Sequence, residues 1–424
     1  MDRIEVTPVR GPLLSSVRAP GSKSITNRAL LLAAMADGPS QVRGALFCDD
    51  TRYMLGALRQ LDFKIVEDET SGLLEVEGRG GLIPAESGDL FVGGAGTAMR
   101  FLSGFLTLAS GRFRLDGNPR MRERPLGELI EALHALGVKA RSELDNQCPP
   151  VIIEGEPGRF AGGAVTVHAD RSSQFVSALL LPAPLWKNGL RLEVIGEAGR
   201  PFVEMTLHLM QRWGAETRVE GESIIIPGGQ KYRPQRFEVE SDASSASYFA
   251  AAAMLCGGSV VIENIGRGSI QGDLRFIEIL RQMGATVRWS ANAVEVSGGG
   301  AFHGIDLDMS GMPDMVPTLA VLAPFADSPT RIRKVGFIRH HESDRIAALA
   351  AELKRMGAKV EEFDDGLEVH PSKLNAAAIK TYDDHRIAMS FAIVGLRLAG
   401  LIIENPSCTS KTYPGFFTQL AALR

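Results

Sequence analysis

The chain has 424 residues, and a typical size of about 150 residues per domain suggests two or three domains. Hydrophobic residues make up 45% and charged residues 23%, which is ordinary for a soluble protein with a sizeable core. The formal net charge of −4 gives no overall basic field, so we expect neither nucleic acid nor a membrane as a partner. Four widely spaced cysteines form no metal-binding cluster, and the charged start of the chain lacks the apolar core of a signal peptide. We therefore expect a cytoplasmic protein without a structural zinc site.

Two series of helices are predicted along the chain. Apolar helices open with small polar or acidic residues near Ser24, Thr97, Ser172, Ser244, Asp314 and Asp384. Amphipathic helices open near Asp50, Arg124, Arg200, Asp273, Asp344 and Tyr413. Both series advance in steps of about 72 residues, which is the signature of an internal repeat.

Glycines mark the ends of several amphipathic helices, at Gly137, Gly214, Gly284 and Gly357. Glycine just past a helix adopts the left-handed conformation cheaply and so terminates it. Short strands such as 190–195 and 259–265 complete each repeat. We predict an α/β fold of six copies of one unit, with three copies in each globular lobe. Coincidental helix spacing in an ordinary α/β protein is the alternative; an open solenoid fits less well, because the long copies share no sharp consensus.

The segment 20–28, Pro-Gly-Ser-Lys-Ser-Ile-Thr-Asn-Arg, leads into the first apolar helix but lacks the spacing of a Walker A loop. Lys23 lies at a helix N-terminus, where a cation is disfavoured unless an anion binds there. Ser24 and Arg28 are four residues apart and share a helix face. The three side chains could converge on one phosphate or carboxylate; a capped helix with solvated charges is the alternative.

Further cations are predicted at or near helix starts, namely Arg124, Arg345, Arg386 and Lys411. Together with Lys23 they disagree with the helix-dipole preference, so we expect a multiply anionic substrate or pair of substrates. The Gly93–Gly96 stretch would let a ligand approach backbone amides, although such glycines often serve only a turn. Asp314 and Glu342 could transfer protons, or could be ordinary helix-start acids.

These motifs together resemble those of the 5-enolpyruvylshikimate-3-phosphate (EPSP) synthase family. The resemblance covers nearly the whole chain, in the family's order, through segments 20–28, 93–100, 122–125, 172–174, 242–248, 313–314, 342–345, 383–386 and 411–412. It implies a two-lobed enolpyruvyl transferase-like fold with three repeats in each lobe. The first lobe would span residues 22–239, and the second would combine 1–21 with 240–424. The chain would cross twice, near residues 21 and 240, and the crossings would form a hinge.

The resemblance implies transfer of the enolpyruvyl group of phosphoenolpyruvate to the 5-hydroxyl of shikimate 3-phosphate by addition and elimination of phosphate, in aromatic amino acid biosynthesis. It implies a monomer that uses no metal or other cofactor and is inhibited by glyphosate. Shikimate 3-phosphate would be held by Lys23, Ser24, Arg28, Ser172, Ser173, Gln174, Asp314 and His341. Phosphoenolpyruvate would be held by Lys23, Gly96, Arg124, Gln174, Arg345, Arg386 and Lys411. The catalytic groups would be Asp314, Glu342 and Lys23.

The chain departs from the family's usual residues at Gly94, Phe101, Gly199, Phe202, Phe337 and His341. His341 stands where the family usually has Lys, so its protonation is expected to matter near neutral pH if it faces the substrate. Two other functions stay open. The related UDP-N-acetylglucosamine enolpyruvyl transferase usually carries a reactive Cys in a loop that here, at 118–125, has none. A non-catalytic anion-binding protein would leave the paired acids Asp314 and Glu342 unexplained.

Overall fold

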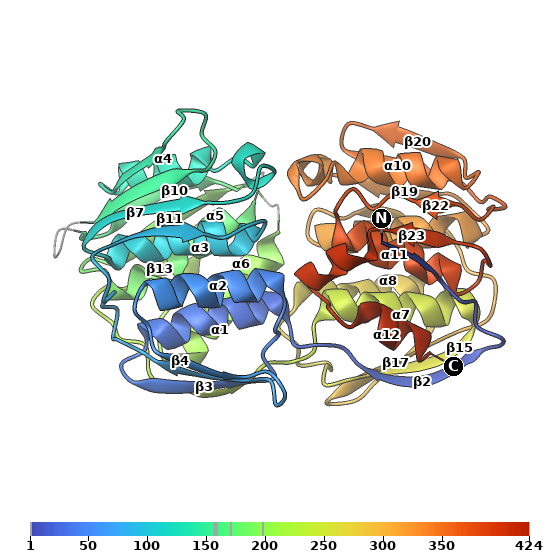
Figure 1. Ribbon diagram of the computed structural model, residues 1–424, viewed down its shortest axis with the longest axis horizontal. Helices are drawn as coiled ribbons and strands as arrows, with labels where there is room; N and C mark the ends of the chain where they lie inside the picture. The colour runs from blue at the N-terminus through green and yellow to red at the C-terminus, as the bar shows by residue number, and fades with distance from the viewer. Residues whose placement is uncertain (1, 156–159, 170–171, 197–198, 424) are drawn as a thin grey trace. The chain divides into compact units, whose positions relative to one another are not determined.

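The computed structural model describes residues 2–155, 160–169, 172–196 and 199–423. The chain divides into two units, each with its own interior (Figure 1). The first unit is Gly21–Val239. The second unit combines the segment up to Pro20 with the chain from Glu240 onward. The chain therefore passes between the units at two points, 20–21 and 239–240.

The first unit is built around three apolar helices, α1 (Lys23–Met35), α3 (Gly96–Phe105) and α5 (Ser173–Leu180). Every residue of α1 from Ile25 to Met35 is buried, as expected for a helix that is apolar on nearly all sides. The amphipathic helices of this unit are α2 (Asp49–Gln60), α4 (Gly127–Ala135) and α6 (Arg200–Arg212).

Three four-stranded sheets of one topology belong to the described part of the first unit. The first has the order β14 (Arg236–Glu238), β3 (Pro39–Arg43), β5 (Leu73–Glu77), β4 (Ile65–Asp68). The second has the order β6 (Ser87–Phe91), β7 (Gly111–Asp116), β9 (Val151–Gly155), β8 (Lys139–Ser142). The third has the order β10 (Gly163–His168), β11 (Leu190–Ile195), β13 (Ser223–Ile226), β12 (Arg218–Glu220). In each sheet the first pair is parallel and the other two pairs are antiparallel.

The second unit repeats this plan. Its apolar helices are α7 (Ala243–Cys256), α9 (Val316–Leu322) and α11 (His385–Gly395). Its outer helices are α8 (Arg275–Met283), α10 (Arg345–Arg355) and α12 (Phe416–Ala421). One sheet has the order β2 (Leu13–Arg18), β15 (Gly258–Glu263), β17 (Ala293–Gly298), β16 (Thr286–Trp289). Another has the order β18 (Asp306–Asp308), β19 (Thr330–Arg333), β21 (Gly366–Val369), β20 (Val360–Phe363). The third is three-stranded, with the order β1 (Arg3–Glu5), β23 (Ile402–Glu404), β22 (Ala378–Ile379).

Short 3-10 helices connect these elements. They are η1 (Leu106–Leu108), η2 (Met121–Glu123), η3 (Ala183–Leu185), η4 (Gly272–Leu274), η5 (Pro313–Met315), η6 (Ala323–Phe325), η7 (Gly336–His340) and η8 (Pro406–Lys411). Within the described residues, no helix is long and apolar enough to cross a membrane.

The sixfold repeat predicted from helix spacing is confirmed: five sheets share one strand order, and the sixth, β22, β23, β1, has the same parallel and antiparallel first two pairs but lacks the fourth strand. The predicted glycine caps are also confirmed. Gly137, Gly214, Gly284 and Gly357 all have positive φ, between 88° and 122°. A residue with a Cβ adopts this backbone conformation at a cost, so glycine there ends the helix.

Two of the predicted helix-start cations are placed differently. Arg124 follows η2 in an extended conformation, and α4 begins three residues later at Gly127. Lys411 is the last residue of η8, at the end where a helix dipole favours a cation. The expected conflict with the dipole therefore applies to Lys23, Arg345 and Arg386, which lie in the first turn of their helices.

Candidate active site

Arg345, the first residue of α10, binds three carboxylates in the second unit. Its Nε donates to Asp384 Oδ2 at 2.8 Å. Its Nη1 donates to Asp314 Oδ1 at 3.0 Å, and its Nη2 donates to Glu342 Oε2 at 2.8 Å. Burial would lower the pKa of Arg345, but the three carboxylates raise it above its ordinary value. One buried guanidinium thus fixes both acids that the sequence suggested for proton transfer.

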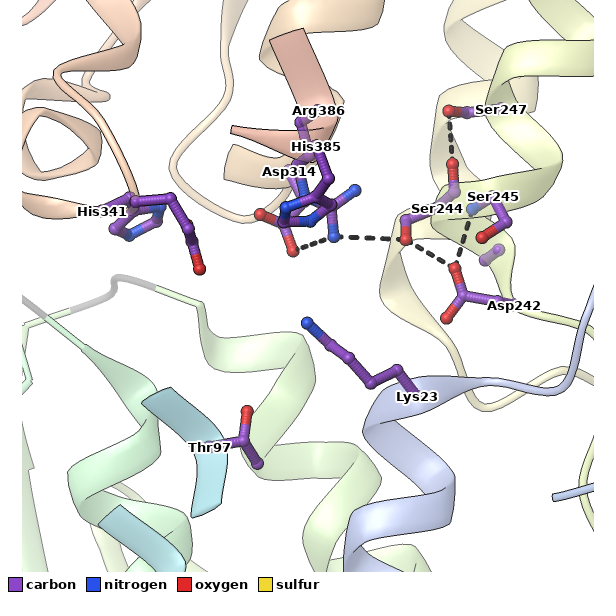
Figure 2. Close-up of polar contacts among 12 residues, drawn as sticks. Lys23, Thr97, Asp242, Ser244, Ser245, Ser247, Asp314, His341, His385 and Arg386 are labelled. Carbon is purple, nitrogen blue, oxygen red and sulfur yellow. Dashed lines mark hydrogen bonds and ion pairs between the residues drawn. The ribbon is translucent and has the colours of Figure 1, made fainter. Parts of the chain in front are cut away.

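Arg386, the second residue of α11, holds Asp314 from another side (Figure 2). Its Nη2 donates to Asp314 Oδ2 at 2.7 Å and to Ser244 Oγ at 3.3 Å. The Ser244 hydroxyl donates in turn to Asp242 Oδ1 at 2.6 Å, and the same oxygen caps α7 by accepting from the Ser245 amide. Burial opposes the charge of Arg386, whereas Asp314 raises the pKa of the guanidinium above its ordinary value. Asp314 therefore lies between two buried guanidinium groups.

Asp384 also contacts Arg345, although the helix pattern in the sequence marked it only as a helix start. It is fully buried, caps α11 through the Arg386 amide at 2.9 Å, and accepts from the Ser343 hydroxyl at 3.0 Å. Its ion pair with Arg345 joins α10 to α11. The local sequence signals the cap, but nothing local signals a partner 39 residues away.

His341 lies next to Arg345, and its Nδ1 is 3.2 Å from Arg345 Nη1. Because a guanidinium has only donors, His341 Nδ1 is the acceptor of this hydrogen bond. The rings of His341 and Phe337 are arranged edge to face, with 5.9 Å between centroids. The expected effect of His341 protonation near neutral pH stays a prediction. Lys411 lies close by, with Nζ 3.8 Å from Glu342 Oε1.

In the first unit, Lys23 begins α1 directly after the capping residue Ser22. The Ser22 hydroxyl accepts from the Ile25 amide at 3.4 Å. Lys23 Nζ forms an ion pair at 3.0 Å with Asp50 Oδ2, at the start of α2. Asp50 is nearly fully buried, so Lys23 is not simply a solvated surface charge. This pair could not be predicted from the sequence, because Asp50 fits the pattern of an acid at a helix start.

The serine pair at the start of α5 has two different environments. Ser172 is the capping residue, and its hydroxyl accepts from the Gln174 amide at 3.2 Å. Ser173 is the first residue of the helix and is buried. The Gln174 side chain donates to Thr97 Oγ1 at 3.3 Å, which joins α5 to the start of α3. Ser172 is thus a helix cap, a role that does not prevent its hydroxyl from also facing a ligand.

Gly96 begins α3 beside two guanidinium groups. A Cβ added to Gly96 would lie 2.9 Å from Nη1 and Nη2 of Arg124 and 3.0 Å from Nη1 of Arg100. Arg100 also donates to the Gly96 carbonyl and, at 3.2 Å, to that of Pro125. The absence of a side chain at residue 96 therefore leaves room for Arg124.

If phosphoenolpyruvate binds beside Gly96, as the family resemblance implies, Gly96→Ala should raise the KM for this substrate and raise the inhibition constant of glyphosate still more, by at least about tenfold. The new methyl group would displace the Arg124 guanidinium and fill the space beside it. Gly56→Ala in α2 is the control, because a Cβ there meets no atom within 4 Å. Inhibition kinetics on the three proteins measure the effect. An unchanged inhibition constant in Gly96→Ala would remove residue 96 from the donor site.

Asp116, at the end of β7, anchors the segment that leads to Arg124. It accepts from Arg122 Nε at 2.9 Å and Nη2 at 2.6 Å, and from the Gly117 amide at 2.7 Å. Arg114 adds a contact of 3.2 Å. Burial alone would raise the pKa of Asp116, but these donors together lower it below its ordinary value. A carboxyl with a lowered pKa stabilises the fold at neutral pH, and that contribution is lost as the pH falls through the lowered pKa.

We expect Asp116→Asn to raise the KM for phosphoenolpyruvate about three- to tenfold at neutral pH. The substitution removes a charge-assisted contact that holds the segment before Arg124 in place. Asp89→Asn, on the exposed face of the neighbouring strand β6, is the matched control and should change the KM less than twofold. If both variants behave alike in steady-state kinetics, Asp116 does not position Arg124.

Among the described residues, no group of three or more His, Cys, Asp or Glu side chains is arranged to hold a metal ion. The polar groups described above are instead carboxylates paired with guanidinium and ammonium groups. This chemistry suits an anionic substrate that exchanges protons with the protein.

Comparison with known proteins agrees with a site for an anionic substrate. The family model of EPSP synthase (3-phosphoshikimate 1-carboxyvinyltransferase) matches residues 9–420. The chain belongs to the EPSP synthase family. The 3-phosphoshikimate 1-carboxyvinyltransferase of Trichormus variabilis is 44% identical over 421 residues, which cover 99% of this chain and 98% of the relative. The chloroplastic enzyme of Solanum lycopersicum is 45% identical and covers 96% of this chain, which spans 81% of that protein.

A solved EPSP synthase from Acinetobacter baumannii has the same fold, with a TM-score of 0.82 and 28% identity. The match covers 99% of this chain and 97% of that structure. The predicted fold class and family are thus confirmed. As a member of this family, the enzyme is a transferase of the shikimate pathway that moves an enolpyruvyl group to shikimate 3-phosphate. The two alternative functions left open by the sequence are not supported.

Proposed function

We propose that this enzyme uses Asp314 and Glu342 as its proton-transfer groups, with Lys23 assisting. Addition joins O5 of shikimate 3-phosphate to C2 of phosphoenolpyruvate, removes the hydroxyl proton and places a proton on C3. Elimination then removes a proton from C3 and breaks the bond between C2 and the phosphate oxygen. Each of these proton movements needs a positioned acid or base.

The three carboxylate contacts of Arg345 are the observation that carries this proposal. Asp314 and Glu342 accept hydrogen bonds from different nitrogens of one guanidinium that is only 1% exposed. Its remaining nitrogen is tied to the fully buried Asp384. These contacts hold both carboxyl groups in place, so the groups that exchange protons are positioned before the substrate arrives.

We assign the substrate contacts to the residues that the family resemblance indicates. Shikimate 3-phosphate is bound by Lys23, Ser24, Arg28, Ser172, Ser173, Gln174, Asp314 and His341. Phosphoenolpyruvate is bound by Lys23, Gly96, Arg124, Gln174, Arg345, Arg386 and Lys411. The cations in these sets neutralise phosphate and carboxylate groups and stabilise the leaving phosphate. Arg28 supports the assignment, since its hydrogen-bond acceptors, Thr206, Ser177 and two backbone carbonyls, are all neutral.

Release of inorganic phosphate from phosphoenolpyruvate tests the proposal. We expect release with shikimate 3-phosphate and none with UDP-N-acetylglucosamine or without an acceptor. Glu342→Gln should then lower kcat about 10²- to 10⁴-fold, the usual contribution of a general acid or base. Release with no acceptor, or full activity of Glu342→Gln, would overturn the proposed roles.

We also propose that the enzyme acts as a cytoplasmic monomer without a bound metal or cofactor. Each unit has its own buried helices, and all four cysteines are free thiols, which is typical of a reducing compartment. Light scattering should give the mass of one 45.6 kDa chain, and a chelator should leave the activity unchanged. A doubled mass would overturn the proposed monomer. Loss of activity with the chelator would overturn the proposal that no metal is required.

A further inference from the structure

Arg28 in α1 has an unusual environment for a buried guanidinium. Its side chain is only 2% exposed. Nε donates to Thr206 Oγ1 at 2.7 Å, and Nη1 donates to the Ser24 carbonyl at 3.0 Å. Nη2 donates to Ser177 Oγ at 3.3 Å and to the Phe202 carbonyl at 3.2 Å. The second hydrogen of Nη1 has no protein partner among the described residues, so it is available to an anionic oxygen.

All of these acceptors are neutral. Thr206 donates its own hydrogen to the Phe202 carbonyl at 2.8 Å, so its oxygen accepts from both Arg28 and the Ser177 hydroxyl. In the described part of the chain, no carboxylate forms an ion pair with Arg28, in contrast to the three that surround Arg345. Burial lowers the pKa of Arg28 to about 9, which leaves the guanidinium charged at neutral pH. Within the described residues, a full positive charge is therefore buried without a counter-charge.

The aromatic ring of Phe101 faces this charge. The Arg28 guanidinium carbon lies 4.9 Å from the Phe101 ring centroid, and Phe101 is 1% exposed. A cation over the face of a buried aromatic ring is attracted by the ring quadrupole, and the attraction grows when both groups are desolvated. Phe101 belongs to α3, the helix that begins with Gly96 and carries Thr97. The ring thus connects the charge on α1 to the helix beside Arg124.

We propose that Phe101 is a positioning residue that holds Arg28 charged and aimed at the acceptor substrate without neutralising it. A carboxylate in this position would stabilise the guanidinium equally well but would cancel the charge that attracts shikimate 3-phosphate. The ring stabilises the cation and leaves its whole charge for the substrate. This inference rests on the proposed function, in which Arg28 binds shikimate 3-phosphate.

Graded fluorination of the Phe101 ring is the sharpest test. Replacing Phe101 with mono-, di- and trifluorophenylalanine weakens the ring quadrupole stepwise and changes the shape of the side chain little. We expect the KM for shikimate 3-phosphate to rise stepwise, by about ten- to thirtyfold over the series, while kcat and the KM for phosphoenolpyruvate change less than threefold. A residue that only fills space would give a flat series.

Conventional variants provide the controls. Phe101→Leu should raise the KM for shikimate 3-phosphate as much as full fluorination does. Phe105→Leu is the matched control, because Phe105 is equally buried, lies one turn along α3 and packs against Phe63, with 5.9 Å between the ring centroids. This variant should change the KM for shikimate 3-phosphate less than twofold. In an Arg28→Met background, fluorination should have no further effect.

The outcomes separate the two proposals. If Arg28→Met folds and leaves the KM for shikimate 3-phosphate unchanged, Arg28 does not bind this substrate and the proposed function is wrong at that residue. If Arg28→Met raises the KM but the fluorinated series is flat, only the role of Phe101 is overturned. If Arg28→Met does not fold, the fluorinated series and the Phe105→Leu control still decide the role of Phe101.

Discussion

Asp314→Asn should lower kcat about 10³-fold, because an amide cannot take up the proton that the reaction releases. The substitution keeps the size of the side chain but supplies only one acceptor oxygen to Arg345 and Arg386, which contact different oxygens of Asp314. We therefore expect a modest fall in melting temperature and a KM that changes far less than kcat. Steady-state phosphate release measures both constants.

Asp306→Asn is the matched control for this experiment. Asp306 lies on β18 in the same unit, its side chain is 62% exposed, and it pairs with Arg333 at 2.6 Å. An exposed ion pair contributes little, so kcat should stay within twofold of the parent. A kcat for Asp314→Asn within tenfold of the parent would mean that another group moves the proton.

Arg345→Met should cause the largest loss of stability among the variants considered. Removal of the guanidinium leaves the carboxylates of Asp314, Glu342 and Asp384 close together without their shared partner, and Asp384 is fully buried. Breaking a buried ion pair from one side typically costs about 3–5 kcal/mol. In a unit of this size the melting temperature should fall by about 10 °C.

The pH dependence distinguishes this explanation from simple loss of packing. The attraction that raises the pKa of Arg345 exists only in the parent protein and weakens as acid neutralises its carboxylate partners, so the stability deficit of Arg345→Met should shrink as the pH falls. Arg281→Met removes an exposed arginine paired with Glu278 and should change the stability by less than about 0.5 kcal/mol. Thermal unfolding between neutral and mildly acidic pH measures all three proteins. A deficit that does not change with pH would contradict the electrostatic account.

Most of the fold could be predicted from the sequence because its signals are local. Ser22, Ser172 and Asp384 cap their helices where small polar residues precede apolar runs, and glycine ends the helices where it was expected. Helix spacing then revealed the repeat, since every copy contains the same two helices. The error at Lys411 has a local cause too, because η8 ends where a longer helix was expected to begin.

The candidate site was only partly predictable, because its decisive contacts join distant segments. Lys23 and Arg345 were singled out as cations, but their partners Asp50 and Asp384 matched the ordinary pattern of acids at helix starts. The ring of Phe101 beneath Arg28 is another such contact. Helix packing creates these pairs, and neither residue spacing nor composition predicts them.

The strand that closes the first sheet of the second unit has a consequence for synthesis of the chain. β2 pairs in parallel with β15, so Leu13 meets Gly258 although the entire first unit separates them in sequence. The first unit is complete once β14 has left the ribosome, whereas β2 must wait, with its backbone unpaired, until β15 follows. Leu14 is 85% exposed even in the finished sheet. During this interval the backbone N–H and C=O groups of the β2 segment have no strand partner. Chains that emerge from neighbouring ribosomes could pair with these groups before β15 is made.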